Sequence, residues 1–231
     1  MSNVTSLGAN IVPIWKYRNR MDYSILPEMR AHWDDLRGGR LMPMRSEVDP
    51  RSLENGLEYC FLVERTQPGA VRLRVAGMHL CDLMGMEVRG MPLRAFLNVA
   101  SRPVFTSRIE RVFHSPEIQI HHLVSNDHGM TPLSGQMMLL PLKGETGEVD
   151  RAMGCLVTSG TVGPNPRRFR LLDTDVTCLR TGNVYTEAKD EIRDRGARLG
   201  FAEAQQPLSG TPISQSVGTR ADGRPDLKII D

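Results

Sequence analysis

The sequence predicts an α+β domain: a five-stranded antiparallel sheet with helical cover on one face, preceded by an amphipathic flanking helix. Three observations predict it. Two β-type segments, 57–65 and 71–75, are separated by a Gln-Pro-Gly turn. Three more, 117–124, 135–142 and 152–158, follow one another through short polar loops, which favours antiparallel pairing. Between these two groups of strands lie short segments whose apolar residues recur at helical spacing.

Composition fits a soluble globular domain. Of the 231 residues, 40% are apolar and 24% charged, and 29 basic against 27 acidic side chains give a net charge of only +2. A nucleic-acid partner is not expected at this charge. Apolar runs are too short for a membrane helix, and Met1–Ala9 lacks the features of a signal peptide, so we expect a cytoplasmic protein without membrane contact.

The first predicted element is an amphipathic helix within 24–43, after an N-terminal arm over 1–23. Ser24 is a suitable N-cap, Pro27 suits the first turn, and Gly38 and Gly39 end the helix. Four apolar residues recur at spacings of three or four and form one stripe: Leu26, Met29, Trp33 and Leu36. Such a stripe docks either on a sheet or against a second copy, and we take it as a hypothetical dimer or partner surface.

The main domain is expected over 44–180. Asp49 and Pro50 can cap a short helix to about Asn55, and 57–65 is apolar enough for a well-covered strand. The segment 71–75 alternates Val or Leu with arginine, as a half-buried strand does. Short helical turns suit 77–91, and a longer helix starts at Ser101-Arg102-Pro103.

The end of the chain changes in composition. After the 117–124 strand, 126–129 has the residues of a hairpin loop. Residues 167–179 offer one more strand that would extend or flank the sheet. The charged stretch 181–204 is expected to be a helical extension, and 205–231, which lacks aromatic residues, a flexible tail.

Several short segments of the sequence resemble segments of PAS domains. Ala76–Leu93 contains a small residue and glycine, two leucines at helical spacing, a G-x-E-x-x-G turn from Gly85 to Gly90, and an apolar docking residue. The segments 33–50 and 167–172 look similar to a family of short, cytoplasmic bacterial PAS-like proteins of the alphaproteobacterial type. The resemblance covers Trp33 to Leu179. It implies a sensory or protein-interaction module, often dimeric, with a cavity between sheet and helices.

A ligand cavity is the main hypothesis for a site. Strand alternation puts Ile118, Ile120 and His122 on one face, and we expect that face to look into the core or cavity. The helical cover would complete it with Met78, His79, Leu83, Met84, Phe105 and Ile109. The alternative is ordinary packing: a buried histidine bonded to a neighbour, and methionines that fill the core.

Cofactor and catalytic chemistry have less support. By analogy with haem-binding PAS sensors, His79, His114 or His122 would be the ligand in an alternative haem-sensor reading. Cys81 lacks the Asn-Cys-Arg-Phe context of flavin sensors, and no residue set has metal-ligand spacing. No catalytic motif occurs. The prediction is therefore a stand-alone, non-enzymatic sensory or regulatory module, without its own output domain, that acts through a small molecule, a signalling partner or a homodimer.

Overall fold

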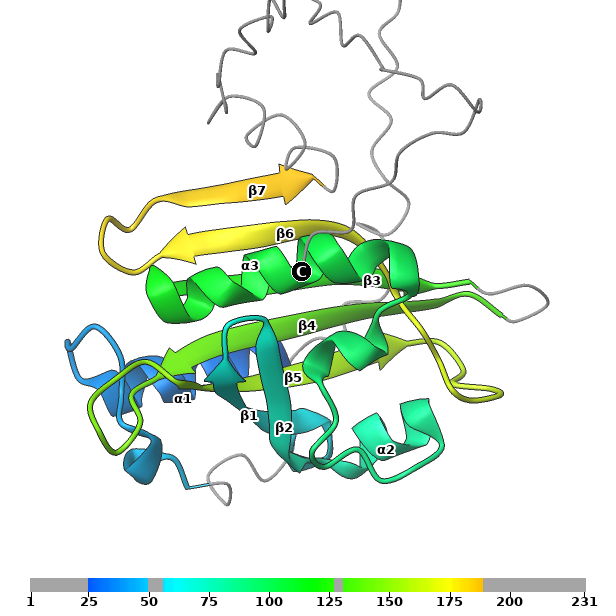
Figure 1. The fold of residues 1–231 in the computed structure, drawn as a ribbon, viewed down its shortest axis with the longest axis horizontal. Helices are drawn as coiled ribbons and strands as arrows, with labels where there is room; N and C mark the ends of the chain where they lie inside the picture. Colours follow the sequence, from blue (N-terminus) through cyan, green and yellow to red (C-terminus); the bar gives the residue numbers. More distant parts are fainter. Residues whose placement is uncertain (1–24, 50–55, 127–130, 189–231) are drawn as a thin grey trace, which may run out of the picture.

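A computed structural model describes residues 25–49, 56–126 and 131–188 (Figure 1). Several expectations fall outside these residues: the arm over 1–23, the short helix over 50–55, most of the 126–129 loop, and the chain from 189 onward, with the tail over 205–231. They remain predictions.

The described residues form one antiparallel sheet with three α-helices. The helices are α1 (Ile25–Arg37), α2 (Met78–Met84) and α3 (Arg102–His114). The strands are β1 (Cys60–Gln67), β2 (Ala70–Ala76), β3 (Glu117–Ser125), β4 (Leu133–Leu142), β5 (Arg151–Ser159), β6 (Arg170–Cys178) and β7 (Val184–Ala188). Their order in the sheet is β2-β1-β5-β4-β3-β6-β7. Within the described ranges, no helix has the length and apolar character needed to cross a membrane.

The sheet has seven strands where five were predicted for its main body. β1 to β5 match the predicted segments within a few residues, and β6 is the expected additional strand beside β3. β7 was missed: Val184–Ala188 lies in the stretch predicted to be helical and pairs with β6 instead. The reason is that only Glu187 of its five side chains is buried, so the strand has no alternating apolar pattern to reveal it.

Apolar cores lie on both faces of the sheet. One packs α2, α3 and the short 3-10 helix Leu93–Phe96 against the sheet, and the other packs α1. In Figure 1, α3 lies in front of the sheet and α1 behind it. β4 serves both cores, since Met137 and Leu139 belong to the first and Met138 and Leu140 to the second. Its unbroken apolar run is the sequence signature of a strand covered on both sides.

The α1 stripe docks on the chain's own sheet. Leu26, Met29 and Trp33 are buried there, and the Trp33 indole Nε1 donates a hydrogen bond of 3.0 Å to the carbonyl of Pro141 in β4. Leu36 packs at the edge of the same core. The stripe was expected to dock either on a sheet or against a second copy. In the structure it docks on the chain's own sheet, and β4 and β5 cover the surface proposed for a second copy.

Candidate functional site

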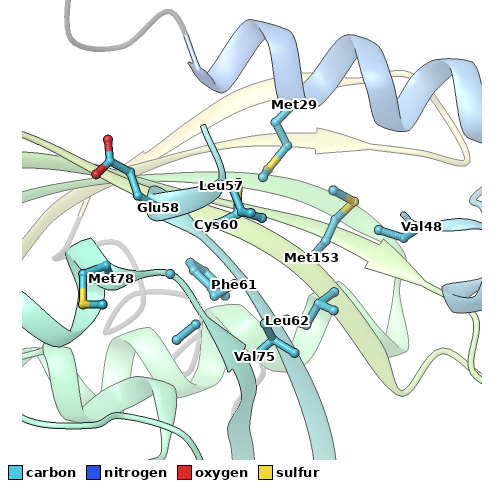
Figure 2. Close-up of a pocket in the computed structure, with 12 residues that line it drawn as sticks. Met29, Val48, Leu57, Glu58, Cys60, Phe61, Leu62, Val75, Met78 and Met153 are labelled. Atoms are coloured by element: carbon cyan, nitrogen blue, oxygen red, sulfur yellow. The ribbon is translucent and has the colours of Figure 1, made fainter. Parts of the chain in front are cut away.

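An apolar pocket of about 480 Å³ opens on the α1 side of the sheet. Figure 2 shows Met29 reaching down from α1 and Met153 rising from β5, with Leu62 and Val75 of the β1–β2 hairpin opposite them. The remaining lining residues are Val48, Leu57, Glu58, Cys60, Phe61, Ala76, Gly77 and Met78. Its volume lies within the range of small-molecule sites, about 300–1,000 Å³.

A β-bulge gives the pocket one of its walls. Leu62 pairs with Val75, but the next residue of β1, Val63, pairs with Leu73, so Arg74 is an extra residue in β2. Leu73 is fully buried under the helices, whereas Val75 is 47% exposed and lines the pocket on the other face. Simple alternation had placed both on one face. The bulge reverses this, because one inserted residue changes the side to which later side chains point.

Gly77 closes the end of the pocket at the start of α2. Its backbone N–H donates to the carbonyl of Cys60 at 2.8 Å. A Cβ atom at this position would collide with the carbonyl oxygen of Glu58. Only glycine therefore allows α2 to begin directly against the 3-10 helix Leu57–Tyr59.

The chemistry of the pocket is that of apolar contact. Glu58 is the one acidic or basic residue among the described lining residues; it is exposed, and in Figure 2 its carboxylate points away from the apolar side chains. Cys60 donates its thiol to the carbonyl of Gly56 at 3.0 Å, and burial raises the pKa of this thiol to about 12. The thiol is thus protonated at neutral pH and is a poor nucleophile. The described lining residues offer an apolar surface, and the Cys60 thiol among them is not activated.

The residues predicted for a cavity under the helices do not enclose one space. Leu83, Met84, Phe105 and Ile109 belong to the α3-side core and are at most 3% exposed. A side chain with almost no exposed surface lines no water-sized void, so here the helices and the sheet are filled by their own side chains. Of the predicted set, Met78 alone lines the α1-side pocket.

Ile118, Ile120 and His122 face away from that core, which corrects the predicted orientation of β3. Ile118 and Ile120 pack in the α1-side core. The side that faces α3 carries Gln119 and His121: Gln119 Nε2 donates to the carbonyl of Arg108, and the His121 ring lies 4.9 Å from that of Phe105. The inference failed because β3 is buried on both faces, and its polar face is covered by polar partners.

The three haem candidates lie in three separate places. His122 Nε2 is 2.8 Å from Asp175, and its Nδ1 is 3.2 Å from Gln136 Nε2. His79 Nε2 is 3.0 Å from Thr158 Oγ1, and burial lowers the pKa of this histidine, against the charges of Glu58 and Asp82. His114 is mostly exposed at the end of α3. None is among the pocket's described lining residues.

Sequence reasoning also missed a buried polar network between α3 and the β3-β6-β7 edge. Arg108 is fully buried, yet it donates to Thr174 Oγ1 and to the carbonyl of Ala188, both at 2.6 Å. Glu187 of β7 lies 2.8 Å from Arg111 Nη2 and 3.4 Å from Arg108 Nε. Nothing in the sequence around Arg108 or around Glu187 indicates that these two residues pair in the folded chain.

The comparison with known families agrees with the fold. The sequence model of the PAS domain matches residues 21–157, which is more than half of the chain. The chain therefore belongs to the PAS domain family, whose fold is of the sensory, signalling type. The β6–β7 hairpin follows the matched region and extends this chain's sheet beyond β3.

Two solved structures are similar at low identity. One is a light-oxygen-voltage domain studied with a flavin analogue: the identity is 15%, the TM-score 0.36, and the match covers 48% of this chain and 83% of that one. The other is a variant of RsLOV, with 16% identity, a TM-score of 0.35, and 63% and 74% of the two chains covered. A search of curated proteins finds no match. At this level the similarity does not bear on a ligand of this chain.

Proposed function

We propose that this chain is a regulatory module that senses an apolar small molecule bound in the pocket between α1 and the β1–β2 hairpin. The observation that carries the proposal is the pocket itself: about 480 Å³, lined almost entirely by apolar side chains. Binding there would bury apolar surface of both partners, at about 25 cal/mol per Å². The proposal keeps the expectations of a cytoplasmic, non-enzymatic module that passes its signal to a partner protein or a second copy.

The pocket's position suggests how a signal would leave it. Met29 of α1 and Met153 of β5 both line the pocket, and α1 is held on the sheet by the same core. A ligand that favours one placement of α1 would shift the population of that placement. Methionine side chains suit this role, since they adapt to ligands of different shape.

The test uses N-phenyl-1-naphthylamine, a neutral apolar fluorescent probe, with two matched valine variants. Val75→Lys places a charged group at the pocket, while Val99→Lys changes a valine that is 76% exposed elsewhere. Wild type and Val99→Lys should bind the probe at one saturable site. Val75→Lys should bind it at least about tenfold more weakly, or about 1.4 kcal/mol.

Equal probe affinity for wild type and Val75→Lys would contradict the proposal. Native mass spectrometry of freshly purified protein then addresses the natural ligand. A mass adduct that disappears on denaturation, and is reduced in Val75→Lys but retained in Val99→Lys, would identify a co-purified molecule at this pocket.

A further inference from the structure

Two arginines of α3 converge on one carboxylate at the edge of the sheet. Arg108 and Arg111 are three residues apart and so lie on one face of the helix. Glu187 lies 2.8 Å from Arg111 Nη2 and 3.4 Å from Arg108 Nε, and its side chain is 4% exposed. Two guanidinium groups around one oxyanion form the arrangement by which proteins recognise carboxylates and phosphates.

The surroundings are polar well beyond one ion pair. Arg111 also bonds Glu117 at 2.9 Å, and Gln119 Nε2 bonds the same Glu117 oxygen at 2.5 Å. Two buried polar atoms of this network, His121 Nε2 and Gln119 Oε1, have no hydrogen-bond partner among the described residues. Burial, together with the charges of Arg108, His122 and Arg111, keeps the pKa of His121 well below its usual range. The imidazole is therefore neutral at pH 7 and does not supply a further cation.

The strand that supplies Glu187 is held by polar contacts and contributes little to the apolar cores. In Figure 1, β7 is the outermost strand and borders β6. It buries only Glu187, while Val184 is 72% exposed. Its departure would expose little apolar surface, so it can open while the cores remain intact. When it opens, Arg108 and Arg111 both lose the Glu187 carboxylate, while Arg111 keeps its bond to Glu117.

We propose that Arg108 and Arg111 form an oxyanion-binding site that Glu187 fills from within the chain, and that an external carboxylate or phosphate competes with Glu187 and releases β7. This site lies on the α3 face, whereas the apolar pocket lies on the α1 face, and the two proposals stand or fall separately. The ligand is an oxyanion, free or carried by a larger molecule. The response is the opening of the terminal strand.

Hydrogen exchange of the full chain tests the competition. Exchange is followed by mass spectrometry in sodium acetate, in sodium phosphate, and in sodium chloride at equal ionic strength. Acetate or phosphate should speed exchange of the β7 amides at least threefold over chloride and leave those of β4 unchanged. The two arms show which oxyanion the site prefers. Equal β7 exchange in all three salts would overturn the proposal.

Variants separate the site from a general salt effect. Arg111→Gln should abolish the difference between oxyanion and chloride, while Glu145→Gln, which changes an exposed loop carboxylate, should retain it. In Glu187→Gln, β7 should already exchange as fast in chloride as wild type does in the effective oxyanion. An unchanged anion response in Arg111→Gln would count against the site even if wild type responds. Of the three substitutions, Glu145→Gln and Glu187→Gln are near-isosteric, and Arg111→Gln keeps a polar side chain while removing the guanidinium; the wild-type anion response is read without any substitution.

Discussion

Replacement of Trp33 should release α1 from the sheet. The side chain is completely buried, its indole N–H bonds the Pro141 carbonyl, and the Arg37 guanidinium lies 5.4 Å from the ring. Trp33→Ala removes the ring and leaves a cavity, at a cost of about 3–5 kcal/mol in the free energy of unfolding. Trp33→Phe keeps most of the apolar contact but loses the hydrogen bond, worth about 0.5–1.5 kcal/mol, together with part of the packing. The alanine variant should therefore be clearly the less stable.

Urea unfolding followed by far-UV circular dichroism measures both costs. Met86→Ala is the control, because Met86 is large and apolar but 58% exposed, and it should change the stability little. Trp33→Ala should also weaken probe binding, since Met29 lines the pocket from the same helix. If Trp33→Ala cost no more than Met86→Ala, α1 would not be docked as described, and the pocket would lose one wall.

Three further predictions concern pH, packing and thiol reactivity. Burial and nearby positive charges depress the pKa of His121 in the folded state, so the unfolded chain binds the extra proton. The His121 contribution to the free energy of unfolding should be fully present above about pH 6.5 and fall by up to about 1.4 kcal/mol per pH unit below it. In urea titrations at pH 5 to 7, His121→Asn should make the free energy of unfolding less dependent on pH. An unchanged pH dependence would exclude His121 as its source. Gly154→Ala would drive a Cβ into the Met138 carbonyl and the Phe61 ring, so thermal unfolding should show the free energy of unfolding lowered by about 1–3 kcal/mol. An unchanged stability would contradict the close approach of β1, β4 and β5. Burial raises the thiol pKa of Cys60 to about 12, whereas hydrogen bonds from Thr181 and Arg180 lower that of Cys178. Iodoacetamide should therefore label Cys178 well before Cys60, as read by peptide mass spectrometry, and the reverse order would refute the assigned environments.

Periodicity predicted most of the fold because most elements bury apolar side chains. The apolar periods located β2 and α3, although the bulge in β2 changed the face of Val75, and the short loops between β3, β4 and β5 favoured antiparallel neighbours. β7 was not predictable in this way, since it is held by backbone pairing and by polar contacts of Thr186, Glu187 and Ala188. Single glutamates occur on many exposed surfaces, and nothing in the sequence distinguishes Glu187 from them.

The site was harder to predict than the fold, because a site depends on which face of a strand each side chain occupies and not only on where the strand lies in the sequence. β3 has an apolar face and a polar face, and the polar one was assumed to be outside. Instead, Arg108 of α3 covers it, and the sheet separates Ile118 and His122 from the helical residues expected beside them. The face of Val75 was also wrongly predicted. A β-bulge, which no residue type in β2 indicates, places Val75 on the face that lines the pocket.

The bond between Trp33 and Pro141 also completes the backbone hydrogen bonding of β4 beyond its ladder with β3. The paired residues of that ladder end at Gln119 and Leu139, while β4 runs on to Leu142. Pro141 is buried, and a buried carbonyl without a hydrogen-bond partner costs free energy. Proline has no N–H donor to satisfy there, and the indole of Trp33 donates to its carbonyl. The same helix that forms a wall of the pocket thus satisfies a backbone acceptor inside the sheet.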